Sequence, residues 1–135
     1  MHSDRVTDVL FDTTFFIDLR RGRRNEAIAY WKDLLRRGIR CCYSPISAYE
    51  LWIGQLVDRD EELFHLAVFN ELHEVPLSLL AASTAGRWSR GMSKDVSDKL
   101  FRDALIAATA STIGASVCTH NVSDFARFQV EIESY

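Results

Sequence analysis

The chain has 135 residues, of which 47% are hydrophobic and 26% charged, as in a single soluble globular domain. This composition excludes a disordered chain, a collagen-like chain and a small disulfide scaffold. The formal net charge of −3 does not by itself favour a nucleic-acid partner, but it divides into net +3 over residues 1–45 and net −6 over residues 46–135.

Short apolar runs alternate with longer helical patterns, as they do in α/β domains. In the first half the pattern predicts a strand at 9–11, a helix at 25–37, a strand at 39–43, a helix capped by Ser47 that carries apolar residues as far as Leu56, and a helix at 58–72. The last of these helices holds more apolar residues than one core face requires, which favours either a second buried surface or a wholly buried helix.

The second half continues the alternation. It predicts a short strand at 74–77, a helix at 78–90, a polar loop at 91–99, an Ala-rich helix at 101–113, a strand at 115–119, a short helix at 122–128 and an edge strand at 129–132. The fold class is therefore α/β, with a central, mostly parallel sheet of four or five short strands flanked by helices. Neither a repeat nor a linker divides residues 1–135, so we expect one domain.

Polar residues follow two of the predicted strands, where ligands gather in open parallel sheets. Asp12, Thr13 and Thr14 come after the first strand, and Thr119, Asn121 and Asp124 come at or after the strand at 115–119. If these two strands are neighbours, Asp12 and Asp124 share one pocket.

Two more acids lie in apolar surroundings, Glu50 within AYELWI and Asp103 at the start of DALIAATA. A buried carboxylate is costly unless it is paired or binds a cation, and hard divalent cations take oxygen ligands of this kind. Simpler interpretations remain open. Asp12 and Asp103 are also suited to cap helices, Glu50 to a surface position and Asp124 to the first turn of a short helix.

Three motifs, in this order, resemble the PIN-domain ribonucleases, and among them the VapC-type toxins of type II toxin–antitoxin pairs. They are VLFDTTFFIDL, SPISAYELWIG and DALIAATASTIGASVCTHNVSDF, the last of which ends in T-x-N-x-x-D-F. The resemblance spans nearly the whole chain. It implies a PIN-like three-layer sandwich and a Mg²⁺- or Mn²⁺-dependent endoribonuclease, whose products carry 5′-phosphate and 3′-hydroxyl ends.

The resemblance also implies roles for particular residues. By motif position, the catalytic and metal-binding carboxylates are Asp12, Glu50, Asp103 and Asp124, and the accessory polar residues are Thr13, Asn121 and Thr119. The sequence departs from the family at His120, where Arg is common, and in the charged stretch before Asp103, where Asp98 is a competing acid.

The implied partners are an RNA substrate, a cognate antitoxin and a second copy of the chain in a homodimer. Antitoxins of this family commonly insert an Arg into the acidic pocket, and the predicted helix at 58–72 suits either an antitoxin helix or the dimer contact. Four arginines between the first strand and the next helix are candidate RNA contacts, with a solubilising loop as the alternative: Arg20, Arg21, Arg23 and Arg24.

Membrane spans and signal peptides have sequence patterns that we do not find here. We therefore expect a cytoplasmic protein, with no membrane partner and with its three cysteines reduced.

Three other functions are open at this stage. One is a PIN nuclease that processes RNA without an antitoxin, and another is a catalytically inactive binding module on the same fold. The third is an aspartyl-phosphate phosphotransfer module, which the segment FDTTFFID faintly resembles. Thr14 stands where that motif has its second Asp.

Overall fold

A computed structural model describes residues 8–54 and 58–135. Its elements are, in chain order, β1 (Val9–Phe11), α1 (Thr13–Arg20), α2 (Arg24–Arg36), β2 (Cys41–Tyr43), α3 (Pro45–Gly54), α4 (Arg59–Asn70), β3 (His73–Glu74), α5 (Leu79–Ser89), α6 (Lys94–Thr112), β4 (Ser116–Cys118), α7 (Val122–Phe125) and β5 (Ile132–Glu133).

The five strands form one sheet in the order β3-β2-β1-β4-β5, and every neighbouring pair is parallel. The central strand β1 places Phe11 opposite Tyr43 of β2 on one side and opposite Cys118 of β4 on the other. Because all strands run the same way, their carboxyl ends lie along one edge of the sheet. The segments that follow β1 and β4 therefore lie side by side, as the sequence predicts.

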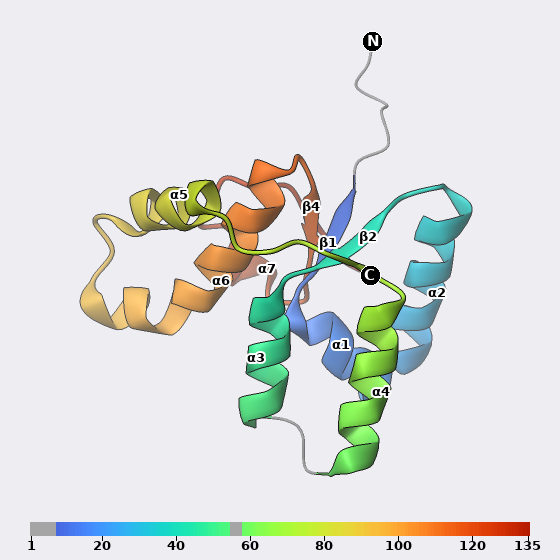
Figure 1. The fold of residues 1–135 in the computed structure, drawn as a ribbon. Coiled ribbons are helices and arrows are strands. Elements are labelled where there is room, and N and C mark those ends of the chain that lie inside the picture. The colour runs from blue at the N-terminus through green and yellow to red at the C-terminus, as the bar shows by residue number, and fades with distance from the viewer. Residues whose placement is uncertain (1–7, 55–57) are drawn as a thin grey trace.

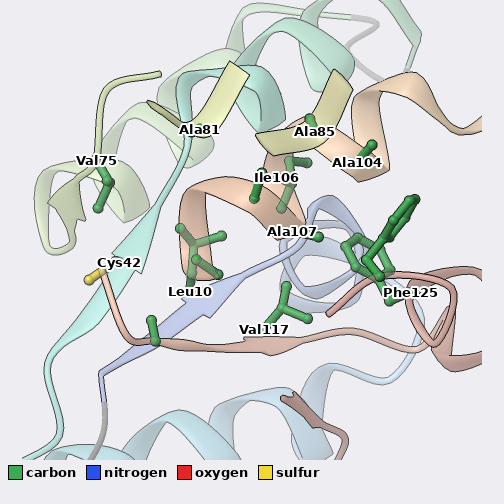
Figure 2. Packing of buried hydrophobic residues seen from close by; sticks show 14 of the residues in the cluster. Leu10, Cys42, Val75, Ala81, Ala85, Ala104, Ile106, Ala107, Val117 and Phe125 are labelled. Carbon is green, nitrogen blue, oxygen red and sulfur yellow. The ribbon is translucent and has the colours of Figure 1, made fainter. Parts of the chain in front are cut away.

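Helices cover both faces of the sheet and give the three-layer α/β sandwich that the sequence predicts (Figure 1). Alternate residues of β1 point to opposite faces. Leu10 packs with α5, α6 and α7 residues, among them Ala85, Ile106 and Phe125 (Figure 2). Val9 and Phe11 pack on the other face, where α1, α2, α3 and α4 supply a core that includes Phe15, Phe16, Leu34, Leu51 and Phe69.

The structure corrects several of the predicted boundaries. The strands predicted at 74–77 and 129–132 are shorter and displaced, at His73–Glu74 and Ile132–Glu133. The predicted loop at 91–99 is wrong beyond Ser93, because the Ser93 hydroxyl accepts a hydrogen bond from Val96 N and begins α6 at Lys94. Ser47 does not cap its helix: α3 begins at Pro45, whose fixed φ suits a first helical position, and Ser47 is buried inside it. Leu56 lies outside the described residues.

Helix α4 has apolar side chains both on its buried face and on its exposed surface. Val68 and Phe69 are buried, whereas Leu63 and Leu66 are more than half exposed. The sequence-based expectation of surplus apolar surface on this helix is therefore confirmed. The three cysteines are free and buried. Within the described ranges, no helix has the length and apolar character that crossing a membrane requires.

Candidate active site

Asp12 follows β1 directly and is only 2% exposed. Its Oδ2 accepts hydrogen bonds from the hydroxyls of Thr119, at 2.9 Å, and Thr14, at 3.2 Å. Thr119 follows β4, so these bonds join the ends of the two neighbouring strands. Thr119 in turn accepts from Asn121 N at 2.9 Å, which ties Asn121 to the same group.

Asp12 stands at the N-cap position of α1, but its side chain makes no capping hydrogen bond there. The interpretation of this residue as a simple helix cap is therefore not supported. Burial raises the pKa of Asp12, and the nearby Glu50 carboxylate raises it further, while the hydroxyl of Thr119 and the backbone N–H of Thr13 act in the opposite direction. The Asp12 carboxyl is thus held in place by the hydroxyls of Thr119 and Thr14 and by the backbone N–H of Thr13.

Glu50 projects from α3 toward α1 rather than outward to solvent, and its side chain is 21% exposed. The Thr13 hydroxyl donates to Glu50 Oε1 at 2.6 Å, and it lies 3.0 Å from the buried Ser47 hydroxyl. Arg102 of α6 contacts the other oxygen, with Nε 3.4 Å from Oε2. The interpretation of Glu50 as a lone surface residue is not supported.

Asp103 lies inside α6, ten residues from Ser93 at its N-cap, so it does not cap that helix. The pKa of its carboxyl is raised to about 7, first by burial and then by the charges of Asp12, Glu50 and Asp124. The other three predicted acids therefore all lie within electrostatic reach of Asp103, and Glu50 also lies within reach of Asp12. The four acids come from four separate segments: the end of β1, α3, α6 and α7.

Asp12, Glu50, Asp103 and Asp124 are called here the acidic pocket. The chemical type of their ligand atoms suits a hard divalent cation. These atoms are carboxylate oxygens, and burial and mutual repulsion raise the pKa of two of the four carboxyls, a cost that a cation would offset. In the described part of the chain, however, no three His, Cys, Asp or Glu side chains are placed to hold a metal as they stand. Both oxygens of Glu50 already have partners within the protein. Closure around a cation would need side-chain rotation.

Asp98, the competing acid in the sequence, is an exposed side chain engaged by a lysine. It is bound to Lys94 one turn earlier on α6, with Nζ 2.7 Å from Oδ2, and its side chain is 64% exposed.

His120 belongs to a cluster beside the pocket that the sequence did not predict. Its Nδ1 lies 2.9 Å from Asp18 Oδ2, and Arg23 donates to its Nε2 at 2.9 Å. Because guanidinium groups only donate, Nε2 is the acceptor in this contact, while Nδ1 faces the Asp18 carboxylate. Tyr135 packs on the His120 ring, with centroids 4.2 Å apart, and its hydroxyl donates to Asp18. His120 N also donates to the Thr14 hydroxyl, at 3.3 Å, so the cluster supports the groups around Asp12.

The four arginines predicted as RNA contacts all have neighbours within the protein. Arg20 lies over the Phe64 ring at 5.7 Å, Arg21 pairs with Glu61 at 3.3 Å, and Arg23 contacts His120 as described. Arg24 lies at the edge of an apolar groove. Of the four, Arg23 is thus joined to the loop next to the acidic pocket.

That groove, called here the α2–α4 groove, has a volume of about 440 Å³ and is mostly apolar. It lies among α1, α2 and α4. Its lining is Leu19, Arg24, Ile28, Trp31, Lys32, Leu35, Phe64, Val68 and Glu71. Helix α4 contributes Phe64 and Val68 to this lining, whereas its exposed Leu63 and Leu66 lie outside the groove.

Sequence reasoning missed two residues that contact the acids, Thr14 and Arg102, and it missed Ser47, which contacts the Thr13 hydroxyl beside Glu50. Ser47 had a usable signal, because it precedes Glu50 by three positions and so shares its helical face. Thr14 belonged to the polar run after the first strand but was given no role. The contact of Arg102 depends on how α3 and α6 pack, and nothing in the local pattern indicates it.

Comparisons with known proteins agree with this architecture. Residues 9–131 match the family model described as PIN domain. VapBC2 from Rickettsia felis, bound to a DNA fragment from its promoter, is similar over 96% of this chain and 99% of its own, with a TM-score of 0.76 and 18% identity. DNA-bound VapBC from Salmonella typhimurium has a TM-score of 0.76 and 20% identity over 96% of this chain and 98% of its own.

A toxin–antitoxin complex from Klebsiella pneumoniae is 28% identical, with a TM-score of 0.67 over 88% of this chain and 91% of that one. The search of curated proteins gave no match.

Proposed function

The chain belongs to the PIN domain family, and on this premise we propose that it is a Mg²⁺- or Mn²⁺-dependent endoribonuclease, the toxin of a VapBC-type toxin–antitoxin pair. One observation carries the proposal: the carboxyls of Asp12, Glu50 and Asp124, from three other segments, lie close enough to the buried Asp103 to add to the effect of burial, and together they raise its pKa to about 7. PIN domains are nucleases, and a carboxylate pocket at the edge of the sheet suits a metal-assisted hydrolase.

In this proposal Asp12, Glu50, Asp103 and Asp124 hold the cation. When bound, the cation polarises the phosphate and lowers the pKa of a water that attacks it. Thr119 and Thr14 fix the orientation of Asp12, and Thr13 fixes that of Glu50, by the hydrogen bonds described above. Asn121 supports Thr119 through its backbone N–H. The ionised form of Asp103, which burial and its neighbours disfavour, is the form that a cation stabilises.

The substrate is RNA, which needs cationic contacts for its phosphates. Arg20, Arg21, Arg23 and Arg24 are the proposed contacts, and Arg23 is the most direct because it is bonded to His120, next to Thr119. The cost of attracting an anion to a chain of net charge −3 falls once the acidic pocket holds a divalent cation.

The α2–α4 groove is the proposed docking site for a helix of the cognate antitoxin. Its walls are apolar and its rim carries Arg24, Lys32 and Glu71, as in grooves that take amphipathic helices. The similar structures described above are toxin–antitoxin complexes. A homodimer is proposed to form through another surface, the exposed apolar residues of α3, where Tyr49 and Ile53 are each more than half exposed.

The test is cleavage of single-stranded RNA by the purified protein in Mg²⁺ and in Mn²⁺. We expect Asp12→Asn to lose at least about 100-fold in rate while folding normally, because a ligand carboxylate becomes an amide. Asp33→Asn is the matched control, since Asp33 lies on α2 and pairs there with Arg36 and Arg37. A folded Asp12→Asn protein that cleaves at the rate of Asp33→Asn would overturn the proposal.

A further inference from the structure

We propose that Arg102 is a positioning residue that holds Glu50 in the metal-free protein and competes with the divalent cation for that carboxylate. The inference rests on the proposed function, because it concerns the same acidic pocket. It goes beyond that function because it gives a side chain of this protein, the positively charged Arg102, a role in weakening metal binding.

The geometry of Glu50 carries the inference. Its Oε1 accepts from Thr13 at 2.6 Å and its Oε2 lies 3.4 Å from Arg102 Nε, so each oxygen is engaged from a different helix. A hydroxyl donor can remain while the oxygen it bonds uses its other lone pair for a metal. A guanidinium at the second oxygen is different, because it carries a positive charge.

The short distance between Glu50 Oε2 and Arg102 Nε brings a metal ion bound to this oxygen close to the guanidinium. A Mg²⁺ ion about 2.1 Å from Glu50 Oε2 would lie no more than about 5.5 Å from Arg102 Nε if the arginine kept its place. Two cations this close in a half-buried pocket repel each other strongly. Arg102 in its present place therefore weakens metal binding through this oxygen.

Arg102 is partly exposed and has a second contact besides Glu50. Its side chain is 33% exposed, and its guanidinium lies 5.3 Å from the ring of Phe101, which is itself 49% exposed. This cation–π contact exists alongside the ion pair, so Glu50 is not the sole partner of the guanidinium.

The proposal is tested by Mn²⁺ affinity, measured by electron paramagnetic resonance on the intact chain. We expect Arg102→Met to bind Mn²⁺ about fivefold more tightly than wild type, the upper range for a partly exposed ion pair. Arg102→Lys, which keeps the charge but loses the planar fork, should give an intermediate affinity. Lys99→Met is the control for loss of one positive charge, because Lys99 is exposed on the same helix, and it should change the affinity less than twofold.

The Glu50→Gln background separates a direct contact from a general charge effect. There Arg102→Met should change Mn²⁺ affinity less than about twofold, because the carboxylate that it holds is gone. An equal gain in both backgrounds, or no gain from Arg102→Met in the wild-type background, would overturn this inference and leave the proposed function standing. A wild-type protein that binds no Mn²⁺ at millimolar concentration would overturn both. If Arg102→Met fails to fold, an unchanged affinity in Arg102→Lys overturns the inference.

Discussion

Replacing Asp103 with asparagine should stabilise the metal-free protein while abolishing its proposed activity. The pKa of this carboxyl is raised to about 7, chiefly by burial and then by the charges of Asp12, Glu50 and Asp124. Keeping Asp103 ionised therefore costs folding free energy. An asparagine of nearly the same shape removes that cost.

The size and the pH dependence of the stabilisation by Asp103→Asn follow from the pKa of Asp103. Below about pH 4, Asp103 is protonated in both the folded and the unfolded chain and costs nothing; the penalty grows between about pH 4 and 7 and is complete above that range. A pKa near 7 against an ordinary value near 3.9 corresponds to about 4 kcal/mol, which we halve to about 2 kcal/mol because the group is partly screened by solvent.

Urea unfolding followed by circular dichroism, with chelator present, measures this difference. At pH 8 we expect Asp103→Asn to be more stable than wild type by about 2 kcal/mol, and at pH 5 by about a third of that. Asp98→Asn is the matched control on the same helix. Its carboxyl is 64% exposed and paired with Lys94, so the change should stay within about 0.5 kcal/mol at both pH values. An Asp103→Asn protein no more stable than wild type at pH 8, or a gain that does not depend on pH, would refute the reasoning.

Two further predictions concern neighbouring groups and the partner. Thr119→Val should cost about 2 kcal/mol in urea unfolding, because the fully buried hydroxyl donates to the Asp12 carboxyl, and an unchanged midpoint would argue against that hydrogen bond. Leu35→Glu should weaken binding of the cognate antitoxin at least tenfold in calorimetry without affecting RNA cleavage, since it places a charge in the α2–α4 groove. Leu79→Glu, at an 86% exposed position on α5 outside that groove, is the control, and equal losses from both variants would contradict the groove assignment.

Much of the fold was predictable because its signals are local. Apolar runs of three to five residues between helical patterns predict a parallel sheet, and the structure confirms that β1 and β4 are neighbours. The start of α6 was missed for a physical reason. Lys94, Asp95 and Asp98 are exposed and polar like a loop, yet the Ser93 cap and the ion pair between Lys94 and Asp98 support an exposed helical turn.

In the candidate site, the acids could be predicted from the sequence, but the contacts that orient them could not. The acids stand out because Glu50 and Asp103 occur in apolar segments, and the structure brings both close to Asp12 and Asp124. The contacts that orient them depend on tertiary packing. Arg102 reaches Glu50 only because α3 and α6 pack together, and His120 meets Asp18 and Arg23 only where the ends of β4, α1 and α2 converge.

Sequencing of RNA ends in cells that express the protein without an antitoxin tests the central claim most directly. The account predicts new fragments with 5′-phosphate and 3′-hydroxyl ends in cells that express the wild-type chain. It predicts none in cells that express a folded Asp12→Asn variant at the same level. The same new ends in both cultures, or no new ends in either, would contradict the assignment of a metal-dependent ribonuclease to the acidic pocket.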